Sequence, residues 1–169
     1  MNRVTRFFTM LPSAVVLCFI AGCSRGNANT SPTLNQGAFL TGDVPTNPMQ
    51  WRVVTSTIDR SNSTMATLYG NDIAVKYART HSGSDYPAGA ELSLVTWRER
   101  DDPHWFGAKI PRDPKSVEFV TVGKSGDGRS SYSYAEYEGA PLRKTNGEES
   151  GTPNAQAAYI LSLRAAVMP

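Results

Sequence analysis

The residue types best suited to chemistry gather in one proline-marked stretch, TWRERDDPHWFGAKIP, at positions 96–111. It combines aromatic side chains with a histidine and several charged groups, namely Trp97, Arg98, Arg100, Asp101, Asp102, His104, Trp105 and Phe106. Aromatic walls beside a few polar groups are typical of small-molecule sites. The stretch is therefore a candidate ligand pocket, with arginine side chains available for an anion.

Two other interpretations of the same stretch stay open. Trp105 and Phe106 could instead close one end of the hydrophobic core, while Asp101 and Asp102 form an Asx turn. His104 could also bind a metal together with a nearby carboxylate. A zinc site, however, needs three or four ligands, and the sequence has no second histidine at a useful spacing. We expect no metal site.

Several other strings fail as catalytic motifs. The string VGKSG, which contains Gly123, resembles the end of a phosphate-binding loop, but Glu118 stands where that loop needs a glycine. Ser125 lacks the G-x-S-x-G context of a nucleophile elbow. His81 lies in the turn-forming string THSGSD, where we expect a solvated loop histidine rather than a general base. We predict no catalytic residue.

Both cysteines lie near the N-terminus and are assigned to export. Two arginines precede an apolar run, residues 7–20, which is too short to cross a bilayer comfortably. The string IAGC that ends at Cys23 resembles the lipobox of bacterial lipoproteins. Residues 1–22 are therefore expected to be a signal peptide, and Cys23 the acylated first residue, with palmitate among its acyl chains. Ser24 fits outer-membrane sorting, which predicts a periplasm-facing, lipid-anchored protein.

Length and charge narrow the possible partners. Removal of 22 residues from 169 leaves 147, the usual size of one domain. The signal also carries two of the 17 basic residues, so 15 remain against 15 acidic ones and the formal charge falls from +2 to 0. A neutral chain without a basic run gives no electrostatic reason to expect nucleic acid. Membrane contact is expected through the lipid anchor.

The remaining chain divides into a tether and a folded domain. Residues 23–48 are rich in Ser, Asn, Thr, Pro and Gly, which predicts a flexible tether. The folded domain is expected over residues 49–169. Alternating and β-branched residues predict strands over 51–59, 64–69, 91–100, 115–122 and 130–139, the last two forming a hairpin around a loop at 123–128.

Proline and capping residues predict what interrupts these strands. Pro103, Pro111 and Pro114 should keep the chain between the third and fourth strands irregular. The stretch Gly70-Asn71-Asp72 should cap a short helix over residues 73–79, with Ile73, Ala74, Tyr77 and Ala78 on its packed face. The C-terminal run 152–169 should form a second helix, with Thr152 as its cap and Pro153 in its first position. These elements predict an α+β domain in which an antiparallel sheet dominates.

Three strings carry a family resemblance. TLYGNDIAVKYAR, YPAGAELSLVTWRER and VEFVTV, at 67–79, 86–100 and 117–122, resemble the cytochrome P-460 family and its relative cytochrome c-prime-beta. The resemblance covers residues 49–169. It implies a β-rich α+β domain in the bacterial envelope, often a homodimer. If the haem pocket of that family persists as a ligand pocket, its expected lining is Tyr69, Trp97, Arg98, Arg100, His104, Trp105 and Phe106.

The sequence departs from the family at the haem attachment. The resemblance implies a c-type haem held by C-x-x-C-H near the C-terminus, and in some members a lysine cross-linked to it. Here the last segment reads YILSLRAAVMP, and Leu94 stands where the lysine is expected. Cys23 is the one cysteine left after processing, and it is expected to carry the lipid. We therefore expect no cofactor.

These observations leave three hypotheses about function. The first is a non-enzymatic, haem-less lipoprotein domain that binds a small ligand or a protein. The second is a redox protein that holds haem non-covalently through His104 and acts on hydroxylamine, nitric oxide or peroxide. The third is a purely structural role in the envelope.

Overall fold

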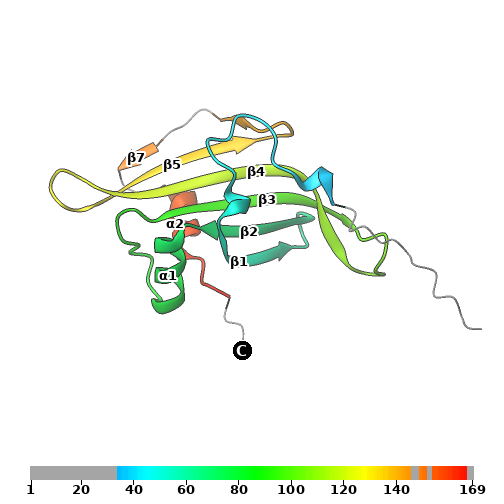
Figure 1. Cartoon of the computed structure of the whole chain (residues 1–169), viewed down its shortest axis with the longest axis horizontal. Helices are drawn as coiled ribbons and strands as arrows, with labels where there is room; N and C mark the ends of the chain where they lie inside the picture. Colours follow the sequence, from blue (N-terminus) through cyan, green and yellow to red (C-terminus); the bar gives the residue numbers. More distant parts are fainter. Residues whose placement is uncertain (1–33, 146–148, 152–153, 167–169) are drawn as a thin grey trace, which may run out of the picture. The chain divides into compact units, whose positions relative to one another are not determined.

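A computed structural model describes residues 34–145, 149–151 and 154–166 of the chain. Within these residues seven antiparallel strands form one sheet in the order β1-β2-β3-β4-β5-β6, and β7 also pairs with β5 (Figure 1). The strands are β1 (Arg52–Asp59), β2 (Thr64–Gly70), β3 (Glu91–Asp101), β4 (Lys109–Lys124), β5 (Ser130–Glu138), β6 (Arg143–Lys144) and β7 (Glu149–Gly151). The helices are α1 (Asp72–Thr80) and α2 (Ala155–Ser162), with short 3-10 helices η1 (Gln36–Ala38) and η2 (Pro48–Gln50). The predicted α+β class with a dominant sheet is confirmed.

Helix α1 begins where the sequence predicts. The side chain of Asn71 accepts a hydrogen bond from the backbone N of Ala74, which satisfies one free amide of the first turn. The packed face differs in part from the prediction, because Ala74 and Val75 are buried whereas Ile73 is 45% exposed. The helix is therefore rotated relative to the prediction, so that Val75 rather than Ile73 packs beside Ala74 on the sheet.

Strand β4 corrects the prediction of an irregular segment at Pro111 and Pro114. These prolines lie inside the strand and pair with Glu99 and Trp97 of β3. The register shifts on both sides of Trp97, which marks β-bulges. Strand β5 pairs with β4 only from Ser116 onward, so the proline-containing part is a sheet edge. Proline is tolerated at edges and bulges because no ladder hydrogen bond is lost there.

The C-terminal elements follow the prediction with one change. Strands β4 and β5 form the expected hairpin, paired from Ser116–Glu138 to Lys124–Ser130. Helix α2 begins at Ala155, and the side chain of Asn154 caps it by accepting from the backbone N of Ala157. The predicted cap, Thr152, lies outside the described residues. No helix within the described residues is long and apolar enough to cross a membrane.

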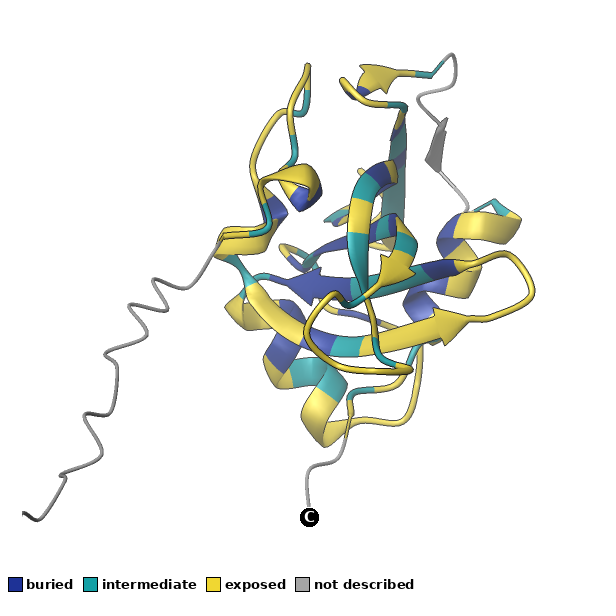
Figure 2. Cartoon of the chain, turned by 90° about the vertical axis from the view of Figure 1, so that its right-hand side faces the viewer, coloured by how far each residue is buried: buried dark blue, intermediate teal, exposed yellow. Residues whose placement is uncertain are grey.

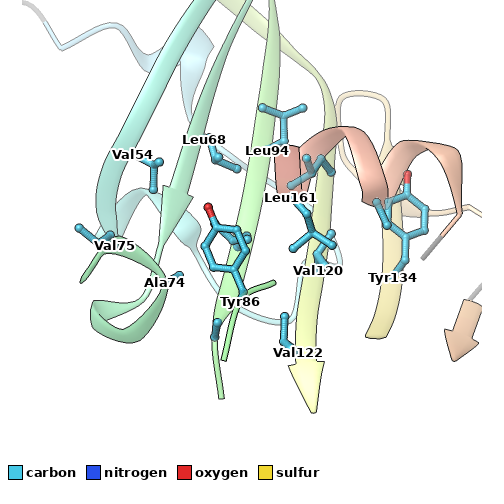
Figure 3. Close-up of a cluster of buried hydrophobic side chains, with 14 residues drawn as sticks. Val54, Leu68, Ala74, Val75, Tyr86, Leu94, Val120, Val122, Tyr134 and Leu161 are labelled. Atoms are coloured by element: carbon cyan, nitrogen blue, oxygen red, sulfur yellow. The ribbon is translucent and has the colours of Figure 1, made fainter. Parts of the chain in front are cut away.

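Both helices cover one face of the sheet. Their apolar side chains meet those of the sheet in one buried cluster (Figure 3). The cluster, called here the helix-side core, contains Val54, Leu68, Ala74, Val75, Tyr86, Ala90, Leu92, Leu94, Val120, Val122, Tyr134, Ala157, Ile160 and Leu161. Leu92 and Leu94 face this side because alternate residues of a strand share a face.

The opposite face carries a second cluster beneath the segment 34–51. This cluster, the N-terminal-side core, contains Ala38, Tyr69, Val95, Trp97, Val117, Phe119, Tyr137 and Leu142, with Leu40, Val44, Trp51, Met65 and Ala135 packed against it. The indole Nε1 of Trp97 donates to the backbone O of Ala38 at 2.9 Å. Gly42 forms a bridge with Leu142, where a Cβ on Gly42 would lie 2.1 Å from the carbonyl oxygen.

These contacts correct the predicted domain boundary. The compact unit begins at Leu34, so residues 34–48 belong to the folded domain and not to the tether. Their Ser, Asn, Pro and Gly content suggested a flexible chain, but the few apolar residues among them pack on the sheet. The predicted signal peptide, Cys23 and the first part of the tether lie outside the described residues.

Candidate functional site

The structure does not gather the predicted pocket residues at one site. Tyr69 and Trp97 are buried in the N-terminal-side core, at 8% and 3% exposure. His104, Trp105 and Phe106 lie in the exposed loop 102–108, where Trp105 is 72% and Phe106 fully exposed. The alternative in which Trp105 and Phe106 close the core is therefore also wrong. Tyr69 and Trp97 lie apart from His104, Trp105 and Phe106 because β3 continues past its bulge at Trp97 and ends in the exposed loop.

The loop has a defined backbone. The backbone N of His104 donates to Asp102 Oδ1 at 2.8 Å, which confirms the predicted Asx turn at Asp102. Two backbone bonds close the loop, from Ala108 N to Trp105 O at 3.1 Å and from Asp102 N to Ala108 O at 3.0 Å. The turn thus fixes the loop with its aromatic side chains toward solvent.

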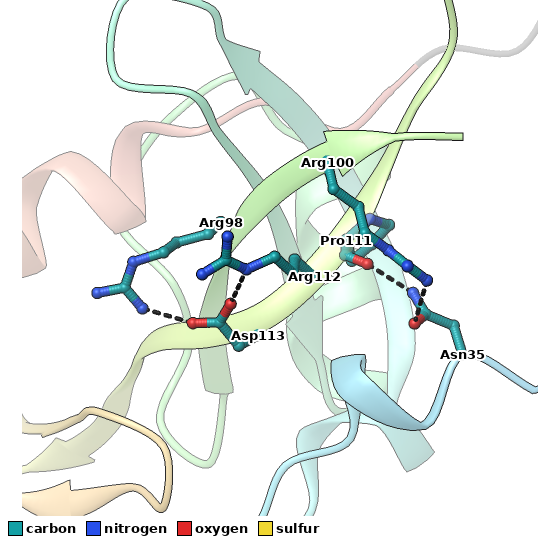
Figure 4. Close-up of polar contacts among 6 residues, drawn as sticks. All are labelled: Asn35, Arg98, Arg100, Pro111, Arg112 and Asp113. Atoms are coloured by element: carbon teal, nitrogen blue, oxygen red, sulfur yellow. Dashed lines mark hydrogen bonds and ion pairs between the residues drawn. The ribbon is translucent and has the colours of Figure 1, made fainter. Parts of the chain in front are cut away.

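The predicted anion-binding arginines already have partners. Arg98 forms an ion pair with Asp113 at 2.6 Å, and Arg112 bonds the other oxygen of the same carboxylate (Figure 4). The hydrogen bond from Arg112, together with that from Arg98, holds the pKa of Asp113 below its ordinary value. Arg100 donates to the side-chain oxygen of Asn35 at 3.3 Å (Figure 4). The arginines therefore tie β3 to β4 and to the segment before η1.

A pocket of about 310 Å³ lies on the face that segment 34–51 covers. Its apolar wall is built from aromatic side chains of three elements, Trp51, Phe119 and Tyr137. The rings of Trp51 and Phe119 meet edge to face with centroids 6.2 Å apart, and those of Phe119 and Tyr137 do so at 5.8 Å. Edge-to-face packing fixes each ring against the next, and the three rings together form one rigid aromatic wall.

The polar lining of this pocket has one sign of charge. Among the described residues Glu91 is the one charged residue that lines it, and the residues with hydroxyl groups are Thr121 and Ser133, with Thr46 of the covering segment. Lys144 stands opposite Tyr137 in the sheet but does not line the pocket. A carboxylate beside aromatic rings favours an organic cation, because the negative ring faces attract positive charge.

One buried polar atom lies on the same face of β3. Ser93 is fully buried, and its Oγ has no hydrogen-bond partner among the described residues. It stands two residues after Glu91 and opposite Phe119 of β4. Such an unpaired hydroxyl costs free energy, and Ser93 itself does not line the pocket.

Sequence reasoning missed this pocket for an identifiable reason. Alternation along β3 does place Glu91 on the face of Trp97, and that signal was available. Trp51, however, precedes β1 and covers Phe119 only because η2 folds over the sheet. No local pattern predicts that contact.

A second, larger groove of about 620 Å³ lies at the end of α1. Its lining combines small and basic residues, namely Ala78, Arg79, Thr80, His81, Ser82, Arg164, Ala165 and Ala166. The ring of His81 stacks on Tyr77 with centroids 4.4 Å apart, and its Nδ1 lies 2.8 Å from the hydroxyl of Thr80. As predicted, His81 is exposed.

Glu118 is a buried carboxyl beneath α2. It is 4% exposed, and the hydroxyl of Tyr134 donates to its Oε2 at 2.9 Å. Burial raises the pKa of Glu118, and the nearby carboxylates of Glu136 and Glu138 add to the rise, while hydrogen bonds from Gln156 and Tyr134 oppose it. This carboxyl helps to hold α2 on the sheet and lines none of the pockets above.

The comparisons agree with the resemblance seen in the sequence. The family model described as cytochrome P460 matches residues 45–156, which is more than half of the chain. This chain belongs to the cytochrome P460 family. No curated protein matches it. The match includes the aromatic pocket, since Trp51, Glu91, Phe119 and Tyr137 all fall inside the matched residues.

The described residues do not fit the haem of the P460 family. Covalent attachment needs thiols, and both cysteines lie at positions 18 and 23, outside the described residues. Leu94, at the expected position of the cross-linking lysine, is 5% exposed and packed in the helix-side core. His104 is exposed on its loop, and the groove beside His81 offers alanine rather than a large apolar wall. We derive no reaction step through haem.

Proposed function

We propose that this P460-family chain is a lipid-anchored, haem-independent binding module that takes a small organic cation in its aromatic pocket. The observation that carries the proposal is the combination of Trp51, Phe119 and Tyr137 with Glu91 in one pocket that no basic side chain of the described residues lines. An ammonium group against the rings gains cation–π attraction, and the carboxylate provides its counter-charge. No step of this function needs a redox centre.

Binding can be tested with a cation and a neutral molecule of similar shape. Tetramethylammonium and tert-butanol would each be titrated into the protein by calorimetry. We expect the cation to bind and tert-butanol to bind more weakly, because only the cation gains from the ring faces and Glu91. Equal binding of the two probes would overturn the proposed ligand class.

Matched variants connect that binding to the pocket. Trp51→Ala removes one ring and Glu91→Gln removes the charge, so both should weaken tetramethylammonium binding. Trp105→Ala serves as the control because this tryptophan is exposed on the loop 102–108 and does not line the pocket. If Trp51→Ala binds the cation as well as the parent chain does, the site lies elsewhere.

The anchor at Cys23 is the second part of the proposal. The string IAGC supports it, together with the apolar run of residues 7–20. We propose that the domain faces the periplasm from the outer membrane. Cells expressing the full chain and fed labelled palmitate should label the parent chain and not the Cys23→Ser variant. Equal labelling of the two would contradict acylation at Cys23.

Haem independence has a spectroscopic test. The protein purified from cells supplied with haem should lack a Soret band. The buried residues around Leu94 include neither a cysteine nor a histidine that could bind haem iron. A Soret band that disappears in His104→Ala would reverse this part of the proposal. It would favour the redox hypothesis instead.

A further inference from the structure

Two of the most exposed apolar side chains of the domain stand side by side at one end of the sheet. Trp105 is 72% exposed and Phe106 is fully exposed, while most other aromatic side chains in the described residues are packed. The Asx turn at Asp102 and the backbone bond from Ala108 to Trp105 hold the loop in a defined shape. Each such ring could bury about 150–250 Å² against a partner, and no other part of the described chain covers them.

The folded unit begins at the same end of the sheet. Asn35 donates from its side chain to the backbone O of Pro111 at 2.5 Å and accepts from Arg100 (Figure 4). Both partners lie close to the loop 102–108, where the end of β3 pairs with the start of β4. Leu34, just before Asn35, is 68% exposed.

The length of chain between the predicted anchor and Leu34 limits how far this end can lie from the membrane. Leu34 follows Cys23 by 11 positions, and 11 extended residues span at most about 40 Å. The turn between β1 and β2 belongs to the same end, because Asp59 pairs with Thr64 and Thr64 with Arg98. It adds Ile58, which is 58% exposed. Figure 2 faces this end, where the loops are coloured as exposed.

The charges near the loop do not favour a charged partner. Residues 98–113 contain four basic and four acidic side chains, so the net charge is zero. Most of them already neutralise one another, as in the pairs Arg98–Asp113 at 2.6 Å and Lys109–Asp101 at 2.6 Å. Attraction at this end must therefore come from the aromatic rings. Trp in particular favours the interface between lipid headgroups and acyl chains.

We propose that this end of the domain lies on the lipid bilayer, with Trp105 and Phe106 inserted at the interface. The proposal rests on the lipid anchor proposed above, which would hold the loop near the membrane surface. Neutral phospholipid suffices, because the loop contributes apolar area rather than net charge. A domain held this way would keep a fixed orientation on the membrane, with the α1 end of β3 turned away from the lipid.

The test is made independent of acylation in the cell. The chain from Cys23 onward retains the whole compact unit and has Cys23 as its sole thiol. Coupling that thiol to a maleimide lipid in phosphatidylcholine vesicles provides the anchor chemically. We expect vesicles with brominated acyl chains to quench tryptophan emission and the bilayer to shift that emission to the blue. Trp105→Phe should lose most of the quenching, because Trp97 is buried and Trp51 is packed on Phe119.

Controls separate insertion from mere proximity. Phe106→Ser should weaken the quenching, whereas Ile73→Ser, which replaces another exposed apolar side chain on α1 at the other end of β3, should leave it unchanged. Quenching that persists in Trp105→Phe would overturn the proposal, as would its absence in the parent chain. Quenching that requires anionic lipid would contradict the apolar mechanism, and cross-linking of Trp105 between two copies would assign the loop to a dimer. Failure of palmitate labelling in cells would refute the natural anchor alone.

Discussion

The two faces of the sheet are covered by different kinds of chain, and they are packed differently. On one face α1 and α2 close the helix-side core, and Ile160 and Ala157 are fully buried. On the other face the irregular segment 34–51 buries only Ala38 and Pro48 of its own residues and leaves a pocket of about 310 Å³. A helix satisfies its own backbone and can present a continuous apolar stripe, whereas an irregular segment needs hydrogen bonds from the surface it covers.

The largest expected effect is the loss of a helix-side contact. Ile160→Ala should lower the free energy of unfolding by about 2–5 kcal/mol, because it leaves a cavity in a closed core. Tyr159→Ala, a neighbouring change at a residue that is 47% exposed, is the control. Urea denaturation of both variants measures the difference. Similar losses in the two would mean that α2 is not tightly packed.

On the other face, the anchor of the covering segment should matter next. Trp97→Phe keeps an aromatic ring but removes the N–H that donates to the backbone O of Ala38. The unpaired oxygen should lower the free energy of unfolding by about 1–3 kcal/mol. Hydrogen exchange should then rise in residues 34–48 before it rises in α2. Trp105→Phe, the same change at a tryptophan that is 72% exposed, is the matched control. Unchanged exchange in residues 34–48 would show that Trp97 does not hold the segment.

A pH-dependent effect should distinguish the faces further. Burial raises the pKa of Glu118 above its ordinary value, so the folded state binds its proton more tightly than the unfolded state does. Its contribution is fully present below the unfolded pKa and is lost as the pH rises through the folded pKa. The parent chain should therefore lose stability as the pH rises from acidic to neutral. Glu118→Gln should not show this loss.

The measurement compares the parent chain with the variant. Denaturation of both at a series of pH values isolates Glu118, since the other carboxyl groups are common to both chains. Asp85→Asn, an exposed change at an acidic residue that does not act on Glu118, is the control. A constant difference between parent and Glu118→Gln at every pH would contradict the assigned direction.

The smallest effect belongs to the exposed ion pairs near the loop. Arg98→Ala should lower the free energy of unfolding by less than about 1 kcal/mol, because both side chains of the Arg98–Asp113 pair are partly solvated. The pKa of Asp113 is held low, so this contribution should fade as the pH falls through that pKa. Thermal unfolding at low and high salt checks it, and a larger loss that does not depend on salt would indicate packing by the arginine stem.

Prediction from the sequence succeeded where the signal is local. Asn71 before an apolar run located α1, and the alternation of Leu92 and Leu94 located β3 and its buried face. It failed at Pro111 and Pro114. Whether a strand can contain these prolines depends on where its neighbour β5 ends, and not on the residues beside them in the sequence. A local pattern cannot state which part of a strand lies at an edge.

The sequence by itself thus determined the five long strands, the hairpin of β4 and β5, the presence of both helices and the family to which the domain belongs. Only the tertiary structure decided that residues 34–48 belong to the fold, that Trp51 meets Phe119 and Tyr137 above Glu91, and that Trp105 and Phe106 stay exposed. Strands and caps follow from neighbouring residues, whose backbone preferences are local. Whether an aromatic ring lines a pocket, fills a core or faces solvent depends on segments far apart in the chain, because burial is a property of the whole packed surface.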